Sequence, residues 1–279
     1  MTIETLGALG AAALGLGGLR LWLAWRSRQW TVGERNGTTV VVRRRGSFLE
    51  LVLRRGDEEL VQSRQVRGDP LGAGPGYVDG LHVGMLLDPR PERVLFLGGG
   101  ACIGPRQFEA AYENATVDVV ENNPLVIAAA NRWFGFRITK RVSLHATDAW
   151  KFVRDKTFGP YDLAIVDVYD ASGMPAELTT AEFFSSVRGA LTAKGAIVVN
   201  LIRGSGLDEP SLLRAVREAF PEHAIALFDV PASRGASIEN VIALVAPEVP
   251  PTPELVARAA SIEVAPFLGE ILRHRREPP

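Results

Sequence analysis

The sequence predicts a doubly wound α/β domain with a mostly parallel sheet, preceded by a small antiparallel β module. From Arg93 onward, short apolar runs alternate with amphipathic segments. Continuous apolar runs of this kind are typical of strands buried on both faces of a parallel sheet. Before that point, β-rich runs are separated by a turn, which indicates antiparallel pairing. The order of the segments therefore predicts one α/β core with a smaller module attached.

Five apolar runs are the expected parallel strands: Val94–Leu97, Thr116–Val120, Val142–His145, Leu163–Val166 and Ala196–Leu201. The segments between them predict helices over Pro124–Phe134, Ala149–Lys156, Ala181–Ala190 and Ser211–Phe220. Two later runs, Ala224–Asp229 and Val241–Val245, predict an antiparallel hairpin at the edge of the sheet. A proline-rich stretch then leads to one or two closing helices.

The β module is expected over residues 31–80 and the α/β domain over residues 81–279. Its expected strands are Thr39–Arg43, Phe48–Arg54 and Glu59–Gln62, and Arg55-Gly56-Asp57 predicts the turn between the last two. A loop rich in glycine and proline follows, and a helix is expected from Leu81 to Leu87.

Composition excludes several classes of protein. The chain has 279 residues, of which 47% are hydrophobic and 23% charged, with a net charge of -1. These values argue against disorder and against bulk nucleic-acid binding. Cys102 is the single cysteine, which excludes a disulfide framework and a cysteine-rich zinc site. The four histidines show no metal-ligand spacing, so no metal site is expected.

Residues 1–30 form a separate N-terminal segment with an apolar run at Leu6–Trp25. Its roughly 20 residues are enough to span a bilayer. Arg20, Arg26 and Arg28 lie toward its C-terminal side, which would place the following domain in the cytoplasm at the inner face of the membrane. Five glycines weaken such a helix. The alternative is a helix packed on the domain or on a second subunit.

Three glycines directly follow the first expected parallel strand, at Gly98, Gly99 and Gly100, and Glu121 ends the second strand. Glycines at this position let the backbone approach a ligand at the start of a helix. A carboxylate at the end of the second strand can accept hydrogen bonds from both hydroxyls of a ribose. The pattern suits a nicotinamide dinucleotide and an adenosyl cofactor equally. Tight strand–helix packing beside a surface glutamate is the alternative.

Carboxylates also follow the third and fourth expected strands. Asp148 can accept the exocyclic amino hydrogen of an adenine, or it can cap the next helix. Asp167 and Asp170 lie where an α/β sheet binds its ligand. Such a pair can hold a protonated amine while one member removes its proton. Capping and solvation of the loop are the alternative. The loop that follows, which contains Glu177, could close over a site.

These segments together resemble the spermidine synthases, or polyamine aminopropyltransferases, over roughly 56–201. RVLFLGGG is similar to the family's glycine-rich first strand, VVENNP to its ribose-binding segment, ATDA to its Gly-Asp-Ala turn, and YDLAIVDVYD to its catalytic segment. The resemblance implies a Rossmann-like sheet of the class I methyltransferase type. It also implies that Asp167 is the catalytic base and that Glu121 binds the ribose. Asp148 would bind the adenine. The three glycines and Ala149 would complete the donor site.

The resemblance further implies an acceptor site on the other side of the base. Its expected substrate-binding residues are Gln62, Tyr77, Asp79, Asp170 and Glu177. Several positions depart from the family pattern: Asn123 replaces an aspartate of the second strand, and the loop DASGMPAELTT has an extra residue before its proline. Ala101 replaces the acid that follows the three glycines, and Val78 replaces a histidine.

The implied reaction is transfer of an aminopropyl group from decarboxylated S-adenosylmethionine to a diamine such as putrescine. Methyl transfer from S-adenosylmethionine on the same fold is the first alternative, and a non-catalytic binding protein is the second. A dehydrogenase is a weaker alternative, because it leaves Asp148 and the Asp167–Asp170 pair without a role. The expected partners are a small-molecule amine and a second copy of the chain, with no metal and no nucleic acid.

Overall fold

The structure is a computed structural model that describes residues 28–74, 76–155, 157–203, 208–231 and 239–279. The expected apolar anchor at Leu6–Trp25 lies outside these residues. Within the described part of the chain, no helix is long and apolar enough to cross a bilayer.

The N-terminal module is a four-stranded antiparallel meander in the order β1-β2-β3-β4. Its strands are β1 (Gln29–Arg35), β2 (Thr38–Arg45), β3 (Phe48–Arg55) and β4 (Glu58–Val66). The three expected strands are present, and the expected turn joins β3 to β4. The strand β1 is not among the expected strands, and its pairing with β2 shifts register between Thr31 and Gly33. This irregularity interrupts the period-2 alternation by which a strand is predicted.

The second sheet has eight strands in the order β12-β10-β11-β9-β8-β5-β6-β7. They are β5 (Arg93–Leu97), β6 (Thr116–Val120), β7 (Val142–His145), β8 (Tyr161–Val166), β9 (Leu191–Arg203), β10 (Ala224–Asp229), β11 (Glu239–Ala246) and β12 (Arg275–Arg276). The five strands from β9 to β7 are parallel, and β10 and β11 form an antiparallel hairpin beside β9. The predicted doubly wound fold is confirmed. The hairpin is not the outermost pair, because β12 pairs with β10.

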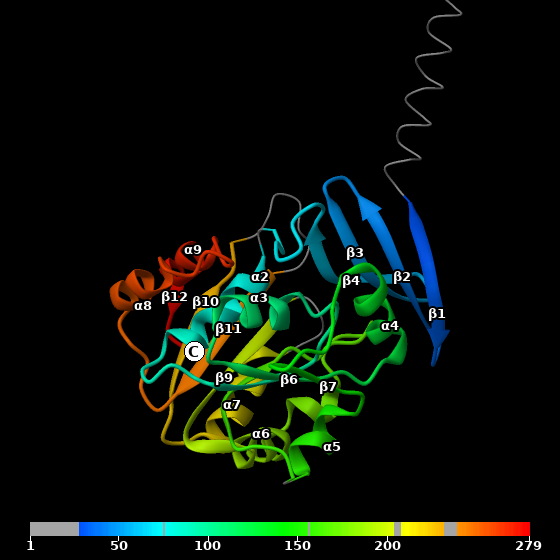
Figure 1. Ribbon diagram of the computed structural model, residues 1–279. Coiled ribbons are helices and arrows are strands. Elements are labelled where there is room, and N and C mark those ends of the chain that lie inside the picture. Colours follow the sequence, from blue (N-terminus) through cyan, green and yellow to red (C-terminus); the bar gives the residue numbers. More distant parts are fainter. Residues whose placement is uncertain (1–27, 75, 156, 204–207, 232–238) are drawn as a thin grey trace, which may run out of the picture.

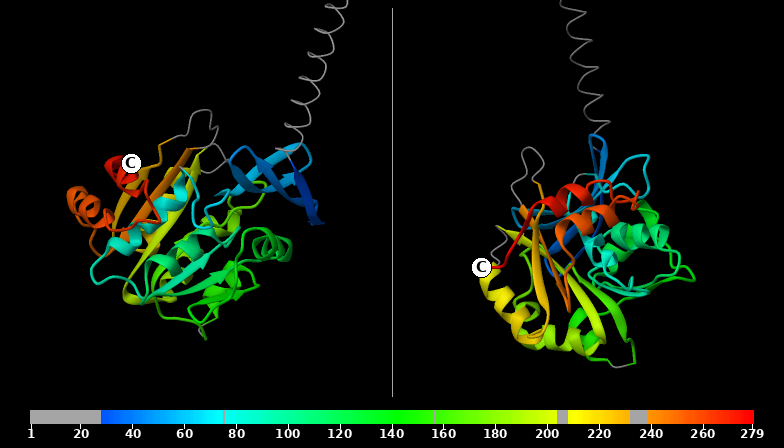
Figure 2. Two further views of the ribbon diagram at one scale, coloured as in Figure 1. Left: turned by 45° about the horizontal axis from the view of Figure 1, so that its top comes forward. Right: turned by 90° about the vertical axis from the view of Figure 1, so that its left-hand side faces the viewer.

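Helices cover both faces of this sheet (Figures 1 and 2). The helical segments are α2 (Tyr77–Gly80), η1 (Leu81–Leu86), α3 (Ile103–Ala111), α4 (Pro124–Trp133), α5 (Ala149–Arg154), η2 (Ala176–Thr179), α6 (Ala181–Gly189), α7 (Glu209–Ala219), α8 (Thr252–Ala259) and α9 (Leu268–Arg273). Buried side chains of η1, α3, α8 and α9 pack on one face. Those of α5, α6 and α7 pack on the other.

One expected helix takes a different form. A helix is expected over Leu81–Leu87, and the structure has a 3-10 helix, η1, over Leu81–Leu86, directly after the single turn of α2. Every residue of η1 is buried. The segment is therefore a connector inside the core and lacks the polar face of a surface helix.

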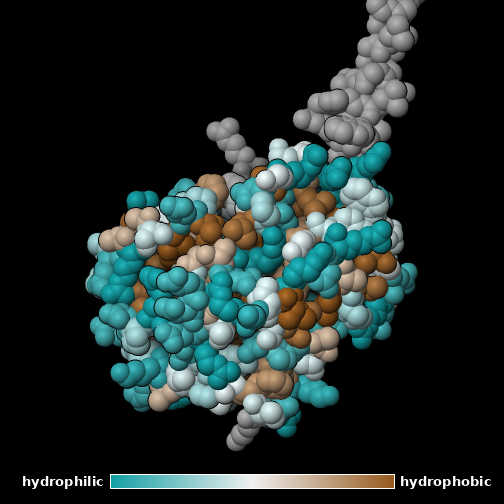
Figure 3. All heavy atoms as spheres, viewed as in Figure 1, coloured by the Kyte–Doolittle hydropathy of each residue, from teal (hydrophilic) through white to brown (hydrophobic). Residues whose placement is uncertain are grey.

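A third apolar core joins the β module to the main domain. It contains Val40 and Val42 of β2, Ala101 from the glycine loop, and Val126 and Ala129 of α4. Ser63 of β4 joins the module to the glycine loop directly, because its Oγ accepts a hydrogen bond from Ala101 N at 3.0 Å. Outside the cores, the face seen in Figure 3 is mostly hydrophilic. Among the described residues, Ile138 is the one exposed large hydrophobic side chain.

Candidate functional site

The candidate site lies where the chain changes direction across the parallel sheet. From the central strand β5 the chain adds β6 and β7 on one side, and it adds β8 and β9 on the other. Gly98 follows β5 and Asp167 follows β8, and Asp167 N donates to Leu97 O at 2.8 Å. Ligands of open α/β sheets bind at such a switch point, beyond the carboxyl ends of the strands.

Gly98 allows the two strand ends to approach closely. Its φ is +94°, and a Cβ built there would lie 2.0 Å from the carbonyl oxygen of Asp167. Any other residue would force the backbones apart. The glycine expected to admit a ligand therefore also sets the position of Asp167.

Glu121, at the end of β6, holds the glycine loop in place. Its Oε2 accepts hydrogen bonds from Gly99 N (3.2 Å) and Gly100 N (3.1 Å), and its Oε1 accepts one from Asn123 N (2.9 Å). The residue is only 7% exposed. Burial raises the pKa of its carboxyl group, and the backbone hydrogen bonds oppose that shift.

Asp148, after β7, occupies the N-cap of α5. Its Oδ1 accepts a hydrogen bond from Lys151 N at 2.9 Å. The expected capping contact is thus present. Thr147, Asp148 and Ala149 also line a cavity together with Glu121.

We call this first cavity the acidic cavity. Its lining residues are Gln62, Gly98, Val120, Glu121, Asn122, Thr147, Asp148, Ala149, Asp167, Val168, Tyr169, Asp170, Pro175 and Leu178. Four of these carry carboxylates, which follow β6, β7 and β8, and β5 lies between β8 and β6 in the sheet. Asp170 is exposed, and its Oδ1 accepts a hydrogen bond from Ser172 N at 2.7 Å.

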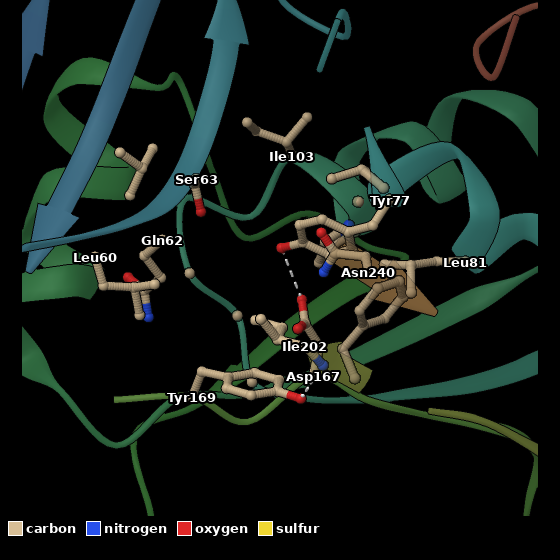
Figure 4. A pocket seen from close by; sticks show the side chains of 18 residues that line it. Leu60, Gln62, Ser63, Tyr77, Leu81, Ile103, Asp167, Tyr169, Ile202 and Asn240 are labelled. Carbon is tan, nitrogen blue, oxygen red and sulfur yellow. Dashed lines mark hydrogen bonds between the residues drawn. The ribbon is translucent and has the colours of Figure 1, made fainter. Parts of the chain in front are cut away.

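A second cavity, called here the apolar cavity, adjoins the acidic cavity and is bordered by Asp167, Tyr77 and Leu81 (Figure 4). Its lining residues are Leu60, Val61, Gln62, Ser63, Tyr77, Val78, Leu81, Phe96, Gly98, Gly99, Gly100, Ile103, Gly104, Pro105, Asp167, Tyr169, Ile202 and Asn240. Among these described residues, Asp167 is the one that carries a charge. The two cavities share Gln62, Gly98, Asp167 and Tyr169.

Asp167 is held from both sides by neutral hydrogen-bond donors. The Tyr77 hydroxyl donates to Oδ2 at 3.0 Å, as Figure 4 shows, and Asn200 Nδ2 donates to Oδ1 at 2.8 Å. Asn240 Nδ2 in turn donates to Asn200 Oδ1 at 2.9 Å. Burial raises the pKa of the Asp167 carboxyl group, and the bonds from Asn200 and Tyr77 partly oppose this. The arrangement holds the Asp167 carboxylate in a fixed orientation, and this carboxylate binds a proton more tightly than that of an exposed aspartate does.

Sequence reasoning missed three residues of this arrangement. Asn200 and Asn240 form the relay to Asp167, and the Tyr169 hydroxyl donates to Asn200 O at 2.8 Å. Asn200 could have been found, because it is the one polar residue in the apolar run from Ala196 to Ile202. A fully buried amide in such a strand needs specific partners.

The structure does not bring two of the expected acceptor-binding acids to either cavity. Asp79 is buried, and its Oδ2 accepts a hydrogen bond from Phe267 N at 2.9 Å. Glu177 is exposed on η2. Neither residue is among those that line the two cavities. Ala101, at the position of the family's acid, is fully buried in the third core.

One further polar residue lines both cavities. Gln62, an expected substrate-binding residue of β4, lines both, and its Oε1 is buried without a hydrogen-bond partner among the described residues. Buried carbonyl oxygens are rarely left without a donor. No group of three His, Cys, Asp or Glu side chains in the described part of the chain is arranged to hold a metal ion.

The structure is thus an α/β protein with two adjoining cavities at the switch point of its parallel sheet. The chain belongs to the spermine/spermidine synthase domain family, whose model matches residues 80–243. The matched segment contains β5 to β9 and the acids that follow these strands.

Curated relatives include two kinds of transferase. The chain is 29% identical to the polyamine aminopropyltransferase of Vibrio vulnificus over 133 residues, which are 47% of this chain and 44% of that protein. It is 28% identical to the human eEF1A lysine and N-terminal methyltransferase over 193 residues, or 64% of this chain and 26% of that protein. The chain therefore matches less than half the length of each of these relatives.

Solved structures confirm the fold. A probable spermidine synthase from Corynebacterium glutamicum has a TM-score of 0.68 at 22% identity, covering 90% of this chain and 89% of that one. Human methyltransferase-like protein 13, solved with SAH, has a TM-score of 0.51 at 23% identity and covers 72% of this chain and 92% of that one. Both share the Rossmann-like α/β architecture with this chain.

Proposed function

We propose that this protein transfers an aminopropyl group from decarboxylated S-adenosylmethionine to an amine, with Asp167 as the general base. The observation that carries the proposal is the position of Asp167. It is the carboxylate that the acidic and the apolar cavities share. A base at such a junction can touch a nucleophile in one cavity while the electrophile occupies the other.

In this proposal the acidic cavity receives the nucleoside of the donor. Glu121 lines this cavity and would accept hydrogen bonds from the ribose hydroxyls. Asp148 lines it too and would accept a hydrogen bond from the adenine amino group. Gly98, Gly99 and Gly100 let the backbone approach the donor. Ala149 forms part of the cavity wall beside the adenine. The family match and the resemblance of these segments to spermidine synthases support the assignment.

The chemistry requires a neutral amine. Its nitrogen attacks the carbon next to the sulfonium, a C–N bond forms, the C–S bond breaks, and methylthioadenosine leaves. The proton lost by the nitrogen goes to Asp167. Burial favours the protonated carboxyl by raising its pKa, so the product state of this transfer is stabilised.

Tyr77 and Gln62 have supporting roles at the same point. The Tyr77 hydroxyl donates to Asp167 Oδ2 and leaves the carboxylate oriented toward the junction. The unpaired Oε1 of Gln62 can accept an N–H of the attacking amine. Asp170, at the rim of the acidic cavity, adds a second negative charge near the sulfonium.

The proposal is tested by incubating the full chain with each donor and a panel of amines and identifying the nucleoside product by mass spectrometry. Decarboxylated S-adenosylmethionine should give methylthioadenosine and an aminopropylated amine. If no amine yields methylthioadenosine above the rate without protein, aminopropyl transfer is wrong.

Methyl transfer is a second candidate, favoured by one observation. Ala101 stands in place of the family's acid, and its side chain is packed in the third core. It therefore offers no negative charge to the terminal ammonium of a decarboxylated donor. S-adenosylmethionine carries its own carboxylate beside that ammonium. In the same experiment, S-adenosylhomocysteine formed from S-adenosylmethionine identifies this reaction.

A further inference from the structure

We infer that the acceptor is a monoamine with an uncharged, apolar body, and that diamines are poor acceptors. This inference rests on the proposed function, since it assigns the apolar cavity to the acceptor. The observation behind it is the distribution of charge around Asp167. The acidic cavity has four carboxylates, whereas the apolar cavity has Asp167 alone among its described lining residues.

A diamine carries two amino groups into the site. One must reach Asp167 and lose its proton, so this carboxylate is committed to the reacting nitrogen. The other remains an ammonium at pH 7 and would lie against such residues as Leu60, Val78, Leu81 and Ile103. An ammonium buried without a carboxylate partner is strongly disfavoured. An alkyl or aryl group at the same place gains favourable apolar burial.

The acids nearest in sequence to the cavity are engaged elsewhere. Asp79 accepts the Phe267 N–H. Glu59, the neighbour of Leu60, pairs with Arg43 and Arg54, and Glu239, the neighbour of Asn240, pairs with Arg203. Asp170, the neighbour of Tyr169, lines the acidic cavity and not the apolar one. Segments 204–207 and 232–238, outside the described part of the chain, contain no Asp or Glu in their sequences.

Most neutral polar groups that line the apolar cavity already form hydrogen bonds within the protein. Ser63 Oγ accepts the Ala101 N–H, and the Tyr169 hydroxyl donates to Asn200 O. Asn240 donates to Asn200. Gln62 Oε1 is the unpartnered acceptor, but it lies at the junction, where the reacting nitrogen needs it. A neutral dipole also stabilises a cation less than a carboxylate does.

The test compares n-butylamine with 1,4-diaminobutane, which have the same carbon chain and differ by one amino group. Methylthioadenosine formation is measured with the full chain and decarboxylated S-adenosylmethionine, with rates corrected for the neutral fraction of each amine. We expect kcat/KM to be at least about 100-fold higher for butylamine. A preference for the diamine, or equal rates, would overturn the inference.

A binding experiment separates this inference from the proposed reaction. Isothermal titration of both amines into the protein saturated with methylthioadenosine measures affinity without turnover. Tighter binding of butylamine supports the inference even where no transfer occurs, in which case only the reaction is wrong. Tighter binding of the diamine, or no binding of either amine, overturns it.

A pair of variants at Leu60 tests the role of charge directly. Leu60 is half-buried in β4 and lines the apolar cavity across from Tyr77 (Figure 4). Leu60→Asp adds a carboxylate to this wall, and Leu60→Asn adds a side chain of the same shape without charge. We expect the ratio of diamine to monoamine affinity to rise about 10-fold in Leu60→Asp and to stay unchanged in Leu60→Asn. Equal changes in both variants would contradict the inference.

Discussion

The acidic and the apolar cavity meet at one carboxylate but are built from different parts of the chain. The walls of the acidic cavity come from the ends of β6, β7 and β8, where the parallel sheet collects the residues after its strands. The apolar cavity is closed by β4 of the N-terminal module and by α2, η1 and α3. The sheet thus positions the four carboxylates of the acidic cavity, and the added elements form the walls of the apolar cavity.

The largest effect on the reaction rate is expected from a substitution at Asp167, where the two cavities meet. Asp167→Asn removes the proton acceptor but keeps a side chain of the same shape, and the Tyr77 hydroxyl can still bond to it. We expect kcat to fall by about 10²- to 10⁴-fold, while the affinity for methylthioadenosine changes little. Steady-state kinetics and isothermal titration measure the two quantities. Full activity of the variant would show that Asp167 is not the base.

A substitution in the acidic cavity should lower the affinity for the nucleoside rather than the rate of the chemical step. Asp148→Ser keeps an N-cap residue for α5 but withdraws the carboxylate from the cavity. Because a hydrogen bond to a charged group contributes about 1.5–3 kcal/mol, we expect nucleoside affinity to fall by about 10- to 100-fold with an almost unchanged melting temperature. Unchanged affinity would show that the Asp148 carboxylate does not bind the nucleoside.

The relay behind Asp167 should give a smaller effect with a distinct signature. Asn240→Ala frees the Asn200 amide, whose bond to Asp167 opposes the rise in pKa caused by burial. The pKa of Asp167 should then rise further, which moves the acid limb of the pH–rate profile to higher pH. We expect a loss of about 3-fold in kcat/KM at neutral pH. A loss that is uniform at all pH values would indicate a purely structural role.

Asp79 should have the smallest effect on catalysis, because it lines neither cavity. Asp79→Asn keeps an acceptor for the Phe267 N–H, so we expect activity to remain within about 2-fold of the wild type, well below the 10²- to 10⁴-fold loss expected for a catalytic base. A loss of activity comparable to that of Asp167→Asn would show that Asp79 takes part in binding the acceptor.

The same variant should change the pH dependence of stability. Burial raises the pKa of Asp79 to about 6, so the native state binds its proton more tightly than the unfolded state does. The stability that this group contributes is present below pH 4 and is lost as pH rises through about 6. The free energy of unfolding of Asp79→Asn, relative to the wild type, should therefore rise by up to about 3 kcal/mol across this range. Urea titrations at pH 4 and pH 7 measure it, and no relative change would contradict the raised pKa.

Much of the fold and of the acidic cavity could be predicted from the sequence. Buried parallel strands are continuous apolar runs, and the residue after each run lies at one edge of the sheet. This is why the strand pattern alone predicts that Glu121, Asp148, Asp167 and Asp170 lie together, and all four line the acidic cavity. The roles proposed for them remain predictions.

The apolar cavity could not be predicted in the same way. Its walls come from β4, η1 and α3, which meet only through tertiary packing. Whether an acid such as Asp79 points into a cavity depends on how α2 docks against the segment at Phe267, and local sequence does not contain that information. The Asn200–Asn240 bond joins residues that are 40 positions apart. No pattern within one strand predicts it.

The contacts of Glu121 have a consequence for ligand affinity. Because its carboxylate already holds Gly99, Gly100 and Asn123, a ligand meets a receptor whose shape was set during folding. The conformational entropy of the loop is lost then and does not reduce the binding free energy. A substitution that loosens this preorganised cradle should therefore weaken ligand affinity before it slows the chemical step.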